Sequence, residues 1–202
     1  MELFWNQRYG AAQYAYGVEP NKFYKEQLIR LKPGKILFPG EGEGRNAVYA
    51  ATLGWEVTAF DSAENGKIKA DMLADLNEVK IDYIVDDAED VVLRKNYFDC
   101  IVFIFVHLPA EKRRLFHRKM MSKLKPGGMV IFEGFAKKQL EFNTGGPRNP
   151  EILFSKEEIW EDFSSQIQDL KIEELETKIS EGEFHHGISQ VIRFVARKKT
   201  II

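Results

Sequence analysis

Short apolar segments rich in β-branched and aromatic residues alternate along this chain with longer segments of helical character. Such alternation is typical of repeated strand–helix units around a mostly parallel sheet. The pattern predicts strands at 35–38, 56–60, 82–85, 100–106 and 129–132. Helices are expected at 46–53, 64–77, 109–124 and 155–163, where glycine or a Pro-Gly pair often follows the last turn.

The last third of the chain does not follow the strand–helix alternation. Two further strands are expected at 170–179 and 188–197, and the connection 180–187 is too short to contain a crossover helix. These two strands must therefore pair antiparallel. The prediction is a Rossmann-like, doubly wound α/β fold, mostly parallel with an antiparallel C-terminal strand and with helices on both faces.

One or two helices with an aromatic-rich loop at 14–21 are expected ahead of the first strand. Since the chain shows no repeat, low-complexity tract or linker, residues 1–202 are expected to form a single domain, with 1–31 as an N-terminal helical lid segment.

Composition narrows the class of protein. The 29 basic and 31 acidic residues give a net charge of −2, which provides no electrostatic footprint for nucleic acid. Cys100, the single cysteine, lies in an apolar run and cannot form an internal disulfide. The N-terminus lacks a secretory signal, and the most apolar run is far shorter than the ~20 residues that a membrane-spanning helix needs. We expect a soluble, cytoplasmic protein, and the sequence leaves its oligomeric state open.

A glycine-rich turn, Pro39-Gly-Glu-Gly-Glu-Gly-Arg-Asn46, follows the first predicted strand. Its spacing is G-x-G-x-G, whereas a dinucleotide fingerprint reads G-x-G-x-x-G. Glu41 and Glu43 make the turn acidic, and an acidic turn binds a pyrophosphate poorly. A cationic ligand without phosphate is favoured, and S-adenosylmethionine, a sulfonium with an ammonium group, is such a ligand.

Acidic residues end the next two predicted strands. Asp61 follows the second strand about 20 residues after the turn, where α/β nucleotide binders place an acid that accepts hydrogen bonds from ribose hydroxyls. Asp86 and Asp87, followed by Ala88, end the third strand, where a carboxylate can accept from the adenine amino group. The three strand ends would contact the methionine arm, the ribose and the base in turn.

Together these stretches make the chain resemble class I S-adenosylmethionine-dependent methyltransferases, and within them the tellurite-resistance and thiopurine type that acts on small molecules. The resemblance runs almost end to end, through Phe4-Trp-Asn-Gln-Arg-Tyr9, Tyr16-Gly-Val-Glu-Pro-Asn21, Gly40-Glu-Gly-Glu-Gly-Arg-Asn46, Asp61-Ser62, Asp87-Ala88, Phe98-Asp99, Leu124-Lys-Pro-Gly-Gly128 and Glu133-Gly-Phe135. It implies a seven-stranded sheet with a reversed last strand.

The resemblance also implies roles for individual residues. Asp61 and Ser62 would hold the ribose, and Asp87 with the Ala88 backbone would hold the adenine, although the neighbouring Asp86 leaves this contact open by one position. Phe105 and His107 would lie near the donor methyl. The methionine arm would be lined by Gly40, Glu41, Gly42 and Gly44, and Asn46, which ends the same motif, joins them in the cofactor site.

Methyl transfer from a sulfonium releases a neutral leaving group, so positioning and exclusion of water carry most of the catalysis. A thiolate or metalloid acceptor needs no base, whereas an oxygen or nitrogen acceptor often does. His107, at the end of the fourth strand, is the preferred catalytic candidate; the alternative is a structural histidine that caps the next helix. His185 and His186 fall in the predicted hairpin loop, where His185 could face the substrate or both could be solvated. Two adjacent histidines lack the spacing of a zinc site, so no metal is expected.

Aromatic residues near the N-terminus can close over the cofactor and stack on its cationic sulfur. We expect site roles for Tyr9 and Tyr16 and simple packing for Phe4. Arg148, in an irregular segment after the fifth strand, could pair with an anionic substrate, although an exposed loop arginine is usually solvated.

Three functions are therefore compared. The first is methyl transfer to a small molecule, such as a thiol or a metalloid. The second is methylation of protein or RNA, which would require a basic rim that 112–114 and 117–119 offer only as an ordinary charged helix face. The third is a non-catalytic S-adenosylmethionine-binding module.

Overall fold

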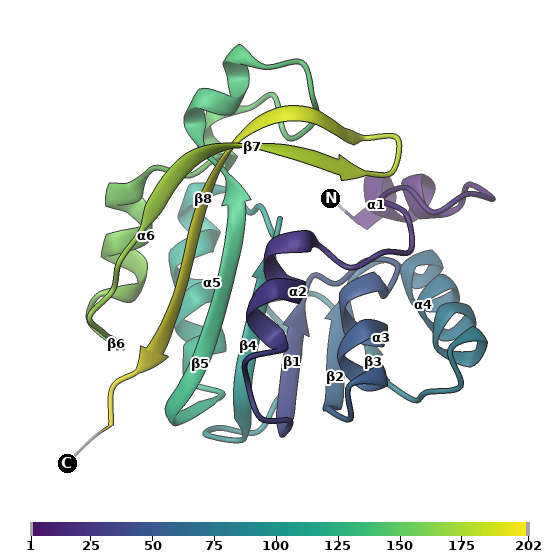
Figure 1. Cartoon of the computed structure of the whole chain (residues 1–202), viewed down its shortest axis with the longest axis horizontal. Coiled ribbons are helices and arrows are strands. Elements are labelled where there is room, and N and C mark those ends of the chain that lie inside the picture. The colour runs from purple at the N-terminus through teal and green to yellow at the C-terminus, as the bar shows by residue number, and fades with distance from the viewer. Residues whose placement is uncertain (1, 201–202) are drawn as a thin grey trace.

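A curled sheet with helices on both faces forms the centre of the molecule (Figure 1). The computed structural model describes residues 2–200, so Met1, Ile201 and Ile202, which belong to the expected domain, lie outside the described residues. Five strands run parallel in the order β3-β2-β1-β4-β5. They are β1 (Lys35–Pro39), β2 (Glu56–Asp61), β3 (Asp82–Val85), β4 (Phe98–Ile104) and β5 (Leu124–Phe135).

Antiparallel pairing completes the sheet at the C-terminal end of the chain. β8 (His185–Lys198) runs antiparallel to β5, and both β6 (Ile167–Gln168) and β7 (Glu173–Glu181) pair with the other edge of β8. β6 and β7 are thus two successive segments of one edge, and the eight strands of the described chain fill seven positions. The predicted sheet, with its reversed last strand, is confirmed.

Alternating side chains of the central strands fill a core on each face. Leu37 and Phe103 pack with α5 (Ala110–Met121) and α6 (Lys156–Phe163) on one face. Ile36 and Phe38 pack on the other face with α2 (Lys22–Leu28), α3 (Arg45–Thr52) and α4 (Glu64–Leu76). The doubly wound arrangement follows from strands that are apolar on both sides. Within the described chain no helix crosses from β3 to β4; residues 86–97 form turns and extended segments.

Three predicted boundaries were wrong for identifiable reasons. The fourth strand ends at Ile104 rather than at 106, because Phe105 takes a left-handed backbone with φ of 55°. β5 begins at Leu124, so the Lys-Pro-Gly-Gly stretch belongs to the strand, beside a register shift in its pairing with β4. The hairpin turn is only 182–184, since β7 and β8 keep pairing up to Glu181 and His185. The 3-10 helices η1 (Lys137–Glu141) and η2 (Pro150–Ile152) were not predicted.

The N-terminal segment and the β7–β8 hairpin meet above the carboxyl ends of the parallel strands. β8 pairs with β5 only from Val191 to Arg197, and its first half extends past the sheet together with β7. In Figure 1 this hairpin arches over the strands, and its turn lies beside α1 (Glu2–Tyr9). Chain winding reverses between β1 and β4, the place where open α/β sheets bind their ligands.

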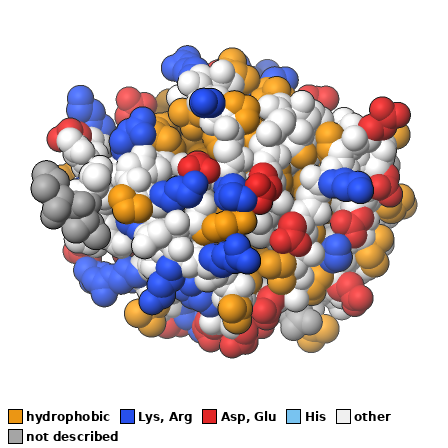
Figure 2. Space-filling model, turned by 90° about the horizontal axis from the view of Figure 1, so that it is seen from below, with side chains coloured by type: hydrophobic (Ala, Val, Ile, Leu, Met, Phe, Trp, Pro, Cys, Tyr) orange, Lys and Arg blue, Asp and Glu red, His pale blue; other side chains and the backbone are white. Residues whose placement is uncertain are grey.

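The opposite end of the molecule, at the amino ends of the parallel strands, carries lysine, arginine, aspartate and glutamate side chains among one another (Figure 2). No helix among residues 2–200 has both the length and the apolarity needed to cross a bilayer.

Candidate active site

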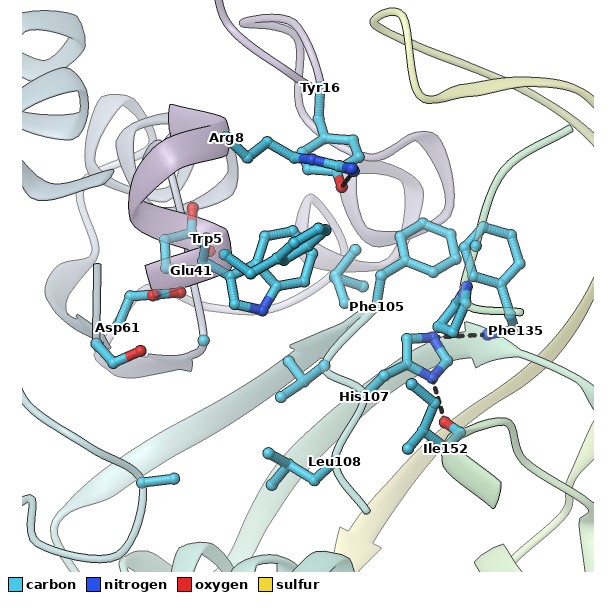
Figure 3. A pocket seen from close by; sticks show the side chains of 18 of the residues that line it. Trp5, Arg8, Tyr16, Glu41, Asp61, Phe105, His107, Leu108, Phe135 and Ile152 are labelled. Atoms are coloured by element: carbon cyan, nitrogen blue, oxygen red, sulfur yellow. Dashed lines mark hydrogen bonds between the residues drawn. The ribbon is translucent and has the colours of Figure 1, made fainter. Parts of the chain in front are cut away.

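A pocket of about 620 Å³ lies at the point where the chain winding reverses. Its floor comes from the segments that follow β1, β2, β3 and β4, and its roof comes from α1, the loop after it and the β7–β8 hairpin (Figure 3). The volume is typical of small-molecule sites, which span roughly 300–1,000 Å³. Predicted site residues that line it are Tyr9, Tyr16, Gly40, Glu41, Asn46, Asp61, Ser62, Asp87, Ala88, Phe105, His107, Arg148 and His185.

The glycine turn forms the pocket wall through Gly40, which has a φ of 62° and lies so close to Val106 that an added Cβ would stand 3.1 Å from its Cγ1. Gly42 and Gly44 do not line the pocket. An added Cβ on Gly42 would stand 2.6 Å from the Tyr9 hydroxyl, and one on Gly44 would stand 2.5 Å from the Ala70 Cβ. These two glycines shape the turn by allowing α1 and α4 to approach it.

Glu41 occupies the start of α3. Its Oε1 accepts hydrogen bonds from the backbone N–H groups of Asn46 (2.9 Å) and Ala47 (2.7 Å). In dinucleotide-binding folds this helix start receives the pyrophosphate. Here a carboxylate of the chain itself fills the position, and burial raises its pKa to about 7. The arrangement favours a cation beside Glu41 and disfavours a second anion.

Glu43 does not contribute to this acidity, contrary to the sequence-based reasoning. Its Oε1 forms a buried ion pair with Lys69 Nζ at 2.7 Å, and its Oε2 accepts from the Ala15 backbone N–H at 2.8 Å. It does not line the pocket. Glu43 instead joins the N-terminal segment to α4, and its charge is offset where it lies.

Asp61 connects the end of β2 to the glycine turn. Its two oxygens accept from the backbone N–H groups of Gly42 and Ala63, each at 3.0 Å, and burial raises its pKa. Since each oxygen keeps a free lone pair, Asp61 can still accept from a ligand. Asp86 and Asp87 both line the pocket, so the choice between them as the adenine partner stays open.

The aromatic N-terminal segment lies over the turn. Trp5 stacks on Tyr9, with their ring centres 5.6 Å apart. The ring centres of Tyr16 and His185 lie 4.5 Å apart. Phe4 was expected only to pack, but it is 53% exposed and borders the pocket. α1 therefore presents one continuous aromatic face, which includes Phe4, to the site.

His107 faces the pocket with both ring nitrogens engaged by backbone (Figure 3). Nδ1 lies 2.7 Å from the Ile152 carbonyl oxygen, and Nε2 accepts from the Phe135 N–H at 3.3 Å. The carbonyl can only accept, so Nδ1 carries the proton. Burial lowers the pKa of His107 to about 4. A general-base role would require breaking the bond to Phe135, so this geometry speaks against the predicted catalytic role and makes His107 part of the aromatic wall.

His185 and His186 lie in β8 rather than in a hairpin loop, so their predicted position was wrong. His186 is exposed, whereas His185 is only 7% exposed and packs against Tyr16, Phe105 and Phe135. The buried Nδ1 of His185 has no hydrogen-bond partner among the described residues and lies 3.8 Å from Glu181 Oε2. Burial lowers the pKa of His185, against the opposing effect of the nearby Glu181 carboxylate.

Several pocket residues were missed from the sequence, among them Arg8 and Phe184. Arg8 follows Phe4 and Trp5 at helical spacing, and this spacing could have placed it on the same face of α1. Phe184 lies in the hairpin turn, and its contact with Arg8 joins segments from opposite ends of the chain. Over residues 2–200 no three His, Cys, Asp or Glu side chains cluster as a metal site would need.

Comparison with known proteins finds similarity to methyltransferases. Residues 36–128 match a family model described as a methyltransferase domain. A ubiquinone biosynthesis O-methyltransferase of Rickettsia typhi is 28% identical over 116 residues, which are 57% of this chain and 46% of that protein. A probable S-adenosyl-L-methionine-dependent methyltransferase, TehB of Haemophilus influenzae, is 30% identical over 105 residues, which are 48% of this chain and 35% of that protein.

Among solved structures, the N-methyltransferase NodS of Bradyrhizobium japonicum in complex with S-adenosyl-L-homocysteine matches with a TM-score of 0.72. It is 15% identical, and the match covers 100% of this chain and 98% of NodS, a likeness that shows the fold. The chain spans less than half the length of the two curated relatives described above. The resemblance found in the glycine turn and the strand-end acids is confirmed.

Proposed function

Because the chain carries a class I S-adenosylmethionine-dependent methyltransferase domain, we propose that the protein transfers the methyl group of S-adenosylmethionine to a small-molecule acceptor. The observation that carries this proposal is Glu41 at the start of α3. A carboxylate in the place of a pyrophosphate suits a cationic nucleoside and not a dinucleotide.

The proposed cofactor contacts follow the order of the strands. Gly40, Glu41 and Asn46 contact the methionine arm, while Gly42 and Gly44 keep the turn in shape behind them. The ribose hydroxyls donate to Asp61, with Ser62 beside it. Asp87 and the Ala88 backbone contact the adenine. Tyr9 covers the turn from α1, and Phe105 borders the place where the methyl group is transferred.

When bound, S-adenosylmethionine supplies a methyl group on a sulfonium that leaves as a neutral thioether. The acceptor's lone pair forms the new bond to carbon as the carbon–sulfur bond breaks, and sulfur keeps the electron pair. The chain's contribution is to align the acceptor and to exclude water. The roof of α1 and the β7–β8 hairpin suits this task, since its aromatic rings cover the pocket.

Where the acceptor loses a proton, we assign the proton to His185 rather than to His107. Both nitrogens of His107 are already bonded, whereas the buried Nδ1 of His185 has no hydrogen-bond partner within the described residues. Tyr16 and Arg148 complete the acceptor side of the pocket. A thiolate or metalloid acceptor would bypass this step. We place the protein in the cytoplasm, as its single buried cysteine suggests.

The direct test is calorimetric titration of the full chain with S-adenosylmethionine and, separately, with NAD. We expect S-adenosylmethionine to bind at least about 100-fold more tightly, a difference of about 2.7 kcal/mol. Asp61→Asn should weaken its binding about tenfold or more. Asp71→Asn, on the exposed face of α4 beside Lys67, is the matched control and should change nothing.

Turnover is then followed with thiols, phenols and metalloid oxyanions as acceptors. Tighter binding of NAD, or no binding of S-adenosylmethionine, would overturn the proposal. Binding without turnover of any of these acceptors would instead favour the non-catalytic module.

A further inference from the structure

Acidic and basic side chains of the pocket come from different segments of the chain and lie in different parts of the pocket. Its carboxylates come from the last residue of β2 and from the loops after β1 and β3, and they lie on the side assigned to the cofactor: Glu41, Asp61, Asp86 and Asp87. Its arginines come from α1, from the start of α3 and from the loop before η2: Arg8, Arg45 and Arg148. Figure 3 shows Glu41 and Asp61 at one end of the pocket and Phe105, His107 and Phe135 at the other, with Arg8 and Tyr16 above.

These arginines differ in how their charge is balanced. Arg45 donates to Glu181 at 2.6 Å, in a pair whose side chains are both buried. Arg8 and Arg148 form no ion pair with any carboxylate among the side chains that the structure describes. Arg148 is exposed and bonded to its own loop, whereas Arg8 is half-buried in the roof. The acceptor side thus has an excess of positive charge.

Arg8 is held in place by aromatic rings. Its guanidinium carbon lies 4.0 Å from the centre of the Phe184 ring and 4.7 Å from that of Phe4. One of its nitrogens donates to the Tyr16 hydroxyl at 3.1 Å, so the Tyr16 proton is left free for another acceptor. Burial raises the pKa of Tyr16, which keeps that proton in place. Arg8 and Tyr16 therefore offer several hydrogen-bond donors to one ligand, and neither of them carries an acidic carboxyl group.

The walls below this pair are flat and apolar. Phe105 stacks on Phe135, with their ring centres 4.5 Å apart. Phe135 in turn stacks on His107, with their ring centres 5.7 Å apart. The His185 ring contacts both Tyr16 and Phe105, so it joins the donor pair to this stack. Such walls select a planar ring and give little to a hydrated inorganic ion.

We propose that the methyl acceptor is an aromatic carboxylate, whose anion is held by Arg8 and Tyr16 while its ring packs against Phe105 and Phe135. The proposal rests on the proposed function, because it assigns the compartment next to the cofactor. The carboxylate is the handle and not the methylated atom, since donors from Arg8 and Tyr16 engage its lone pairs. The nucleophilic atom belongs to another position of the same molecule, nearer to the cofactor.

The test measures binding to the full chain saturated with S-adenosylhomocysteine, so that it does not depend on turnover. Calorimetry compares three aromatic carboxylates, benzoate, 4-hydroxybenzoate and indole-3-acetate, with neutral benzyl alcohol, cationic benzylamine and inorganic selenite. We expect at least one of the three carboxylates to bind about tenfold more tightly than benzyl alcohol, with benzylamine and selenite weaker still.

Variants assign the effect to the donor pair. Arg8→Gln should remove at least about tenfold of the carboxylate affinity and leave benzyl alcohol unchanged. Tyr16→Phe, which keeps the ring, should cost about threefold to tenfold. Arg114→Gln, in an exposed position of α5 outside the pocket, is the matched control.

S-adenosylhomocysteine affinity checks that each variant is folded. Failure of all three carboxylates to exceed benzyl alcohol would overturn the proposal, as would equal losses for both in Arg8→Gln. Selenite binding more tightly than every carboxylate would also overturn it. If S-adenosylhomocysteine itself fails to bind, the proposed function fails instead.

Discussion

Glu41 shows how one side chain can select the charge of a ligand. Its carboxylate is buried, bonded to two backbone N–H groups of α3, and has a pKa raised to about 7 by burial. A cation beside it favours the ionised form, so binding near neutral pH should release a proton. The same group thus accepts from the start of α3 and, in the proposed function, would also act as the counter-ion of the bound cation.

The first prediction concerns the pH dependence of S-adenosylmethionine binding. Below the pKa, a proton must leave Glu41 before the cation is bound, so affinity should fall as pH is lowered from 7 to 5, by at most about tenfold per pH unit. Glu41→Gln keeps an oxygen for the helix cap and should lose most of this slope. Calorimetry at several pH values measures it. An unchanged slope in the variant would show that another group is responsible.

His107 gives a second prediction at the same scale. With its pKa lowered to about 4 and its Nδ1 proton donated to Ile152, it should stay neutral from pH 8 down to about 5. Imidazole NMR signals report both the midpoint and the tautomer, and His107→Gln assigns them among the four histidines of the chain. A midpoint above 6, or a proton on Nε2, would contradict the hydrogen-bond arrangement and would make His107 available as a base again.

The role of a single residue can be predicted well from the sequence where its hydrogen-bond partners lie nearby in the chain. Asp61 is recognisable because it ends a strand two residues before Ala63, whose N–H it accepts. The hydrogen-bond partners of Glu43 and His107 were not predicted because these partners, Lys69 and the Ile152 carbonyl, lie 26 and 45 residues away. Phe184 was missed for the same reason. Charge and position identify a candidate, but a partner distant in the sequence decides whether it is free to act.

At the scale of elements, both ends of α3 depend on a glycine with positive φ, which offers a matched pair of substitutions. Gly44 precedes the helix with φ of 87°, and Gly54 follows it with φ of 84°. An added Cβ would stand 2.5 Å from Ala70 at the first position, and nothing lies within 4 Å at the second. An alanine at either position would have to adopt a left-handed backbone conformation, but only at Gly44 would its Cβ also collide with a neighbouring helix.

Gly54→Ala should therefore cost about 1–2 kcal/mol in the free energy of unfolding, the price of the left-handed conformation alone. Gly44→Ala should cost roughly 1–3 kcal/mol more, because α4 must move away from the turn. Urea denaturation measures both. Equal losses of unfolding free energy would mean that α4 can move away from the turn at no cost, so that the close packing of Gly44 against Ala70 does not stabilise the protein.

The first two strands were predicted almost to the residue, since their apolar runs are largely buried in the sheet. They were expected at 35–38 and 56–60 and span Lys35–Pro39 and Glu56–Asp61. Elements near the site deviated more: Phe105 leaves the strand through a positive φ, and β7 and β8 continue past β5 as a two-stranded hairpin. Local pattern cannot reveal a hairpin whose partner is α1, from the other end of the chain.

At the scale of the whole molecule, buried polar side chains join the roof of the pocket to its floor. Asn21 donates to Glu133 of β5 at 3.0 Å and to Glu181 of β7 at 2.8 Å. Arg45, at the start of α3, donates to Glu181, and Arg193 of β8 pairs with Glu133. The glycine turn, the N-terminal segment and the hairpin thus share one network, although they are far apart in the sequence.

The final prediction measures this connection by a double-mutant cycle on Arg45 and Glu181, whose side chains are each 9% exposed. Either Arg45→Met or Glu181→Met leaves a buried charge without its partner and should cost about 3–5 kcal/mol in urea denaturation. The double variant removes both charges, so its cost should be smaller than the sum of the two by at least about 1 kcal/mol. Additive costs would mean that the hairpin and the glycine turn are stabilised independently. Coupled costs would mean that the hairpin covering the pocket and the glycine turn fold as one unit, since neither can keep its charge buried alone.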